Sequence, residues 1–161
     1  MRALLLTLAL LPSAALADCG ADTEIFSCQI GKKQLQICFD DRADVFAYTF
    51  GRKGKPDLSL WETTPDLDFQ PWPGVGSAIW ENVTFYNDGH SYEVWTSVQR
   101  DPEDQSGLSA GVTVRQGETT LTTLTCNPGS ASQSLDVIYD VKVAYGQCWS
   151  FADQAWAWSC D

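Results

Sequence analysis

Two segments of alternating apolar and polar residues, each containing cysteine, restrict the possible folds more than any other feature of the sequence. In residues 24–39, every second residue is apolar on both sides of a turn at Gly31-Lys32-Lys33. The apolar residues of one face are Phe26, Cys28 and Ile30 before the turn and Leu35, Ile37 and Phe39 after it. Residues 111–126 show the same kind of alternation on both sides of a turn near Gln116-Gly117, and they end at a cysteine. This period of two is typical of half-buried strands, so we expect two hairpins that frame one disulfide-stabilised β domain.

The same alternation restricts how the six cysteines pair. We expect Cys28 to lie opposite Ile37, which turns Cys38 to the other face and disfavours a Cys28–Cys38 bridge. Cys126 shares the face of Leu124 and is the natural buried partner of Cys28. The predicted disulfides are therefore Cys28–Cys126, Cys19–Cys38 and Cys148–Cys160, the last of which closes a local loop.

The first 17 residues have the pattern of a bacterial secretory signal peptide. Arg2 precedes an apolar run, and Ala15-Leu16-Ala17 forms a small-residue cleavage site before Asp18. The apolar run is shorter than the roughly 20 residues that span a bilayer. We expect cleavage and release, with a lipid anchor at Cys19 as the alternative. Six cysteines in the exported part favour an oxidising compartment, which predicts a periplasmic or secreted protein.

Residues 18–161 are long enough for one domain and short for two. The formal net charge of −11 argues against binding to nucleic acid or to anionic membranes. It is compatible with a basic protein partner, or with solubility alone. No apolar stretch beyond the signal segment is long enough to cross a membrane, and the sequence predicts no cofactor.

The remaining pattern predicts an all-β protein, an antiparallel sandwich or partly open barrel of about 7–9 strands. A proline- and glycine-rich loop at 62–77 and the C-terminal loop should cover one end. Residues 127–133 resemble a linker, and residues 150–158 are the one candidate for a short helix. Further strands are expected at residues 45–50, 57–61, 78–86, 91–98 and 135–145.

Motifs along residues 25–126 resemble a layout found in small exported bacterial β proteins of no known activity. They are FSC-x9-C, YTFGRKGKPDLSL, NVTFYNDGHSYEVW and AGVTVRQGETTLTTLTC. The resemblance implies a β fold and a shared arrangement of turns and cysteines, and it implies no activity. The architecture is also similar to that of periplasmic lysozyme inhibitors. Their paired Ser-Gly-x-x-Tyr and Tyr…Lys-Gly motifs are missing here, because Ser106-Gly107-Leu108-Ser109 lacks the tyrosine.

Residues suited to catalysis or metal binding are sparse. The single histidine, His90, lies in a predicted turn, where no second group orients it as a base. The cysteine spacing does not suit zinc. Two clusters of carboxylates, Asp66 with Asp68 and those of residues 101–104, are compatible with the acid/base pair of a glycosidase. The cluster at 101–104 is also compatible with a Ca²⁺ site. An enzyme is not expected, and no catalytic or metal-ligating residue is assigned.

The seven tryptophans are the sharpest functional signal. Trp156 and Trp158 alternate around Ala157, so an extended segment would project both rings to one side. The candidate binding residues are Trp72, Trp149, Trp156 and Trp158, as an aromatic platform for sugar rings or for a protein interface. The alternative is a tail that covers an open sheet end. The sequence predicts a protein-binding module, such as an inhibitor of a basic hydrolase like lysozyme, or alternatively an envelope glycan-binding protein.

Overall fold

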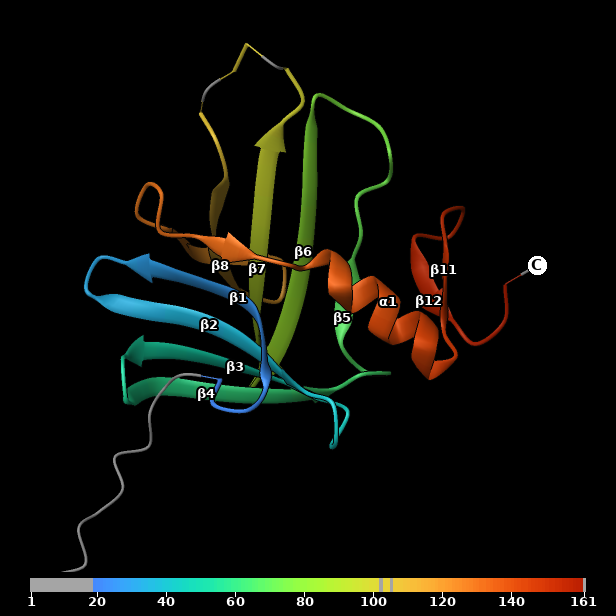
Figure 1. Cartoon of the computed structure of the whole chain (residues 1–161), viewed down its shortest axis with the longest axis horizontal. Helices are drawn as coiled ribbons and strands as arrows, with labels where there is room; N and C mark the ends of the chain where they lie inside the picture. The colour runs from blue at the N-terminus through green and yellow to red at the C-terminus, as the bar shows by residue number, and fades with distance from the viewer. Residues whose placement is uncertain (1–18, 102, 105, 161) are drawn as a thin grey trace, which may run out of the picture.

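Two five-stranded antiparallel sheets make up most of the protein, and their strands cross at a steep angle (Figure 1). The computed structural model describes residues 19–101, 103–104 and 106–160, so the signal-peptide prediction falls outside the described residues. The first sheet has the order β10 (Ser132–Gln133), β1 (Thr23–Ile30), β2 (Lys33–Asp40), β3 (Val45–Arg52) and β4 (Lys55–Thr63). The second has the order β5 (Asp68–Gln70), β6 (Ala78–Asn87), β7 (His90–Gln99), β8 (Ser109–Gln116) and β9 (Thr119–Thr125).

The core lies between the two sheets, where their alternating apolar side chains meet. The largest buried side chains include Phe26, Phe46 and Tyr48 from the first sheet and Phe69 and Phe85 from the second. The rings of Tyr48 and Phe85 have centroids 5.4 Å apart and join the sheets directly. Within the described residues neither sheet closes into a barrel. The predicted all-β, disulfide-stabilised fold is confirmed.

The register of the first hairpin differs from the expected one by two residues. Ile30 pairs with Lys33, so the turn is Gly31-Lys32, and Cys28 lies opposite Leu35 rather than Ile37. Because the shift is even, every side chain keeps its predicted face. The three disulfides are Cys19–Cys38, Cys28–Cys126 and Cys148–Cys160, which are the predicted pairings.

The C-terminal part departs from the expectation. The predicted strand at 135–145 is wrong: Asp136–Tyr145 forms helix α1. Leu135, Ile138 and Lys142 are buried on one side at helical spacing, and the α1 C-terminus is capped by Gly146 with a φ of 105°. The suggested helix at 150–158 is also wrong, because these residues belong to a hairpin of β11 (Cys148–Ser150) and β12 (Ala155–Ala157).

Two short strands lie where we expected only loop or linker. β5 falls within residues 62–77, and β10 within residues 127–133. They extend the two sheets to ten strands, more than the 7–9 predicted for the domain, with the C-terminal hairpin in addition. No helix in the described residues is long and apolar enough to cross a membrane.

Candidate functional site

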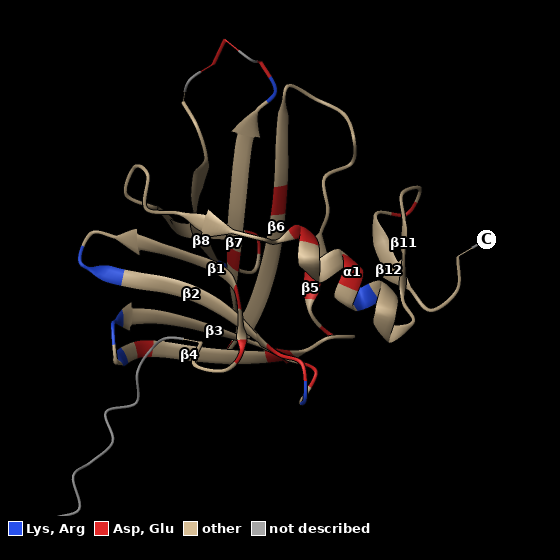
Figure 2. Ribbon diagram, in the orientation of Figure 1, with Lys and Arg blue, Asp and Glu red and all other residues tan. Residues whose placement is uncertain are grey.

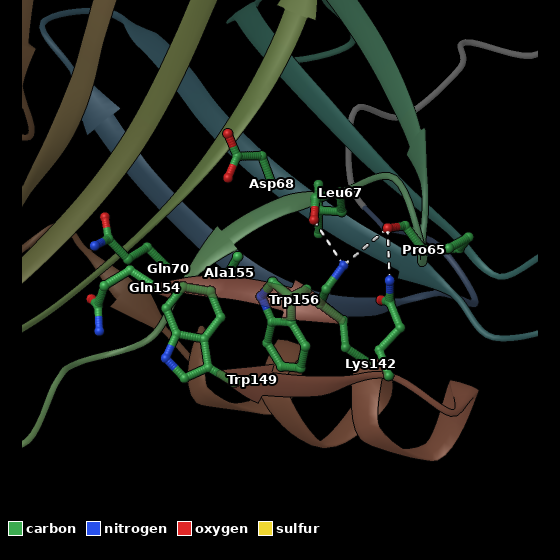
Figure 3. Close-up of a pocket in the computed structure, with 10 residues that line it drawn as sticks. Pro65, Leu67, Asp68, Gln70, Lys142, Trp149, Gln154, Ala155 and Trp156 are labelled. Atoms are coloured by element: carbon green, nitrogen blue, oxygen red, sulfur yellow. Dashed lines mark hydrogen bonds between the residues drawn. The ribbon is translucent and has the colours of Figure 1, made fainter. Parts of the chain in front are cut away.

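A cavity of about 340 Å³ lies where β5, α1 and the β11–β12 hairpin meet (Figure 3). We call it the C-terminal cavity. Its wall combines two indole rings with amide, carboxylate and apolar side chains. The lining residues are Pro65, Leu67, Asp68, Gln70, Lys142, Gln147, Trp149, Gln154, Ala155 and Trp156.

Lys142 fixes one wall of this cavity. Its side chain is fully buried, and Nζ donates hydrogen bonds to the backbone oxygens of Thr64 and Leu67, both at 2.8 Å. A longer contact of 3.4 Å reaches the oxygen of Pro65 (Figure 3). Burial lowers the pKa of the Lys142 ammonium to about 8, although Asp68 and Asp66 act in the opposite direction. The ammonium thus holds the 64–67 segment against α1.

The two tryptophans of the hairpin form the aromatic wall. Trp149 and Trp156 are paired across β11 and β12, and their ring centroids are 5.5 Å apart in an edge-to-face arrangement. Trp156 donates its indole N–H to the backbone oxygen of Phe69 at 2.7 Å and packs against Tyr139 at 5.3 Å. These contacts dock the hairpin onto β5 and α1 and hold the rings in place.

Two buried polar atoms of the cavity residues have no hydrogen-bond partner within the described part of the chain. They are Nε1 of Trp149 and Oε1 of Gln147, and each of these residues is only 7% exposed. The side-chain amide N–H of Gln147 donates a hydrogen bond to the backbone oxygen of Pro65 at 3.2 Å. The unpaired atom of this side chain is therefore its oxygen, Oε1. An unpaired buried donor or acceptor costs about 1–3 kcal/mol. Each of the two atoms has less than 1 Å² of accessible surface, so both are covered by the surrounding chain and neither is open to the cavity.

The four tryptophans singled out from the sequence lie in three separate settings. Trp149 and Trp156 line the C-terminal cavity. Trp158 is 64% exposed and packs against Tyr145 near the end of α1, at a centroid distance of 6.0 Å. Trp72 lines a different recess, and the guanidinium of Arg100, which is not part of that lining, lies 5.2 Å from its ring centroid.

The recess at Trp72, which we call the acidic recess, has about 340 Å³ and combines aromatic rings with carboxylates. Burial, together with the charge of Asp136, raises the pKa of Glu81 to about 7. A cation placed next to Glu81 would favour the ionised carboxylate and lower this pKa again. The lining residues are Pro71, Trp72, Ile79, Glu81, Asp136, Tyr139, Asp140 and Phe151.

The other groups considered from the sequence have local partners. His90 Nδ1 lies 2.9 Å from the backbone oxygen of Asp88 in the β6–β7 turn. The Asp66 carboxylate accepts from the Thr63 hydroxyl, and that of Asp68 accepts from the Tyr86 hydroxyl. In the acidic loop, Asp101 accepts from the backbone N–H of Glu103. No cluster of potential metal ligands occurs among the residues that the structure describes.

Sequence reasoning missed Lys142 and the glutamines of the cavity. Because residues 135–145 were expected to form a strand, nothing indicated that Lys142 would be buried. The signal that was available is the helical spacing of Leu135, Ile138 and Lys142, which places them on one side of a helix. Gln70 and Gln147 carry no comparable signal, because their role depends on segments distant in the sequence.

Comparison of the chain with protein-family models, with curated proteins and with solved structures finds no match. The class of protein is therefore defined by the fold and the site alone: an all-β, disulfide-stabilised protein with a tryptophan-lined cavity at its C-terminal end.

Proposed function

We propose that this protein binds glycan through the C-terminal cavity. The observation that carries the proposal is the pairing of Trp149 and Trp156 with three glutamines and a carboxylate around one cavity. Sugar rings present apolar C–H faces that pack on indoles, and hydroxyl groups that need both donors and acceptors. An aromatic wall with a few convergent polar groups meets both requirements.

Export to the cell envelope is part of the same proposal. All six cysteines are paired in three disulfides, which persist in oxidising compartments such as the periplasm or the extracellular space. The signal-like sequence of residues 1–17 supports the same location. Glycan polymers exposed to these compartments, peptidoglycan among them, are the ligands that we would test first.

Filling the cavity should abolish glycan binding and leave the fold intact. Ala155 is exposed on β12 and lines the cavity, so an Ala155→Phe side chain occupies the volume in which a sugar would pack. We expect the mature, oxidised variant to lose co-sedimentation with purified peptidoglycan sacculi, at low and at high salt.

The matched control is Ala152→Phe, which adds the same ring to an exposed position of the same hairpin outside the C-terminal cavity. The control should pellet with sacculi as the unmodified protein does. Equal pelleting of all three proteins would contradict the proposed site. Failure of the unmodified protein to bind sacculi or soluble oligosaccharides would contradict the function.

A second candidate function, binding to a basic protein such as lysozyme, is favoured by the acidic recess. Carboxylates of Glu81, Asp136 and Asp140 share that recess with the rings of Trp72, Tyr139 and Phe151, a setting that suits a lysine or arginine side chain. Figure 2 shows acidic residues on α1 and on β6, whereas many of the basic residues lie in the β1–β2 and β3–β4 turns. The net charge of −11 would also steer a basic partner toward the protein.

This second function predicts a salt-dependent association rate. The rate constant for binding a basic lysozyme should fall by about tenfold or more between low and physiological ionic strength. Asp136→Asn with Asp140→Asn should lower the rate further than Asp41→Asn with Glu118→Gln, which removes the same charge from exposed positions outside the recess. Surface plasmon resonance measures both. Equal binding to an acidic hydrolase would contradict this function.

A further inference from the structure

One row of residues crosses the second sheet from its β5 edge to its β9 edge. The strand register pairs its five members in this order: Gln70, Asn82, Trp95, Gly111 and Thr125. Neighbouring residues of the same strands point into the core, namely Phe69, Val83, Val94 and Val112. Because side chains alternate along a strand, the row lies on the outer face of the sheet. We call it the outer row.

Trp95 gives the outer row an aromatic surface. A Cβ atom at Gly111 would lie 2.7 Å from the Trp95 ring, so the glycine leaves the space that the indole occupies. The ring therefore leans across β8 instead of standing upright on β7. Trp95 is partly exposed, so one side of the indole is open to solvent and can pack against the C–H face of a sugar.

Uncharged polar groups flank this ring. The side-chain N–H of Asn82 donates to the side-chain oxygen of Gln70 at 3.3 Å. Among the described residues, this bond leaves the Asn82 oxygen and the Gln70 N–H groups for the hydroxyl groups of a ligand. Thr125, beyond Gly111, adds an exposed hydroxyl.

The outer row contains no ionisable side chain, in a protein whose net charge is −11. A row of amides, a hydroxyl and an indole suits an uncharged ligand, because it offers hydrogen bonds and apolar surface but no counter-charge. The net charge of the protein would in addition repel a polyanionic chain.

The outer row begins at the C-terminal cavity. Gln70 belongs to both, because it lines the cavity and bonds Asn82 of the row (Figure 3). Neighbouring strands are about 4.8 Å apart, so Trp95, two strands away from β5, lies about 10 Å further along the sheet. We infer that the ligand is an uncharged glycan chain of several sugar units, which occupies the cavity at one end and lies along the outer row at the other. The inference rests on the proposed glycan binding and extends its ligand from one sugar to a polymer.

The test is the dependence of affinity on chain length. Isothermal titration calorimetry with the mature, oxidised protein uses cello-oligosaccharides and chito-oligosaccharides of one to six units. In at least one of these uncharged series, the hexamer should bind at least about tenfold more tightly than the monomer. A galacturonate hexamer, with a carboxylate on every unit, should bind at least about tenfold more weakly than that uncharged hexamer.

Trp95→Ala removes the aromatic surface of the outer row and leaves the cavity lining unchanged. It should weaken hexamer binding by about tenfold and leave monomer binding nearly unchanged. Trp61→Ala is the matched control, because it removes an exposed indole from β4 of the other sheet, and it should change neither affinity. Since Trp95 also covers Gly111, Asn82→Ala is a second variant that keeps this contact, and it should weaken hexamer binding several-fold.

The outcomes separate this inference from the function on which it rests. A hexamer that binds no more tightly than the monomer, or equally well to the unmodified protein, Trp95→Ala and Asn82→Ala, overturns the extended path and leaves glycan binding in the cavity standing. Binding to sacculi without affinity for either oligosaccharide series overturns the path as well. Tighter binding of the galacturonate hexamer overturns the assignment of an uncharged ligand. Hexamer binding that survives Ala155→Phe, or no binding of any oligosaccharide or of sacculi, overturns both the path and the proposed function.

Discussion

Replacing Cys28 and Cys126 by alanine should lower the free energy of unfolding by about 4–5 kcal/mol. The two cysteines are 98 residues apart in the sequence. Cys28 lies on β1 of the first sheet, and Cys126 directly follows β9 of the second, so the bridge covalently joins the two layers of the sandwich. Closing a loop of this length removes unfolded-state entropy worth about 4.7 kcal/mol in the chain-entropy relation. Urea denaturation of the oxidised proteins, followed by tryptophan fluorescence, measures the loss.

The matched comparison is Cys148→Ala with Cys160→Ala. That disulfide spans only 12 residues and should contribute about 3 kcal/mol by the same relation. Its loss should loosen the hairpin that carries Trp149 and Trp156, whereas the core between the sheets stays intact. Equal losses from the two double variants, or a larger loss from the second, would contradict the entropic argument.

The disulfides could be predicted from the sequence because strand alternation depends on neighbouring residues alone. The predicted register placed Cys28 opposite Ile37, whereas the partner is Leu35. An error of two residues preserves the face of every side chain, so the argument that paired Cys28 with Cys126 survived it. A register error of one residue would have moved every side chain to the opposite face, and the argument would then have disfavoured the Cys28–Cys126 pairing.

The helix could not be predicted in the same way. In residues 135–145, Val137, Tyr139 and Val141 fall at every second position and fit a strand, whereas the spacing of Leu135 and Ile138 fits a helix. The side-chain cap expected at a helix start is absent, because Leu135 occupies that position. Tertiary contacts decide between the two, and the deciding residue is buried Lys142, whose carbonyl partners at Thr64 and Leu67 lie 78 and 75 residues away.

Only part of the candidate site could therefore be predicted from the sequence. Tryptophan content and the alternation around Ala157 pointed to the C-terminal segment, and both Trp156 and Trp158 contact α1. The sequence could not show that Trp158 stays exposed while Trp149 is buried, because that depends on the fold of β5 and α1. The unpaired Trp149 and Gln147 atoms are visible only in three dimensions.

Replacing Lys142 by methionine should lower the free energy of unfolding by about 3 kcal/mol at neutral pH. Methionine preserves most of the apolar stem but removes the ammonium that bonds the carbonyls of Thr64 and Leu67. Each buried carbonyl left without a donor costs about 1–3 kcal/mol, and part of this cost is offset because no charge has to be buried. Pro65 keeps its bond from Gln147. Lys53→Met, at an exposed position, is the matched control and should change stability by less than about 0.5 kcal/mol.

The pH dependence of the same pair tests the argument independently. In the folded protein burial lowers the pKa of Lys142 from 10.5 to about 8, so between these values the unfolded chain binds more protons than the folded one. Stability then rises with pH through this window, on the order of 2–3 kcal/mol in total, and is unaffected by this group below pH 8. The stability difference between the unmodified protein and Lys142→Met should therefore widen from pH 8 to pH 10.5 in urea titrations. A constant or shrinking difference would show that the Lys142 ammonium is not destabilised by its burial, and that its three carbonyl contacts fully replace the water it loses.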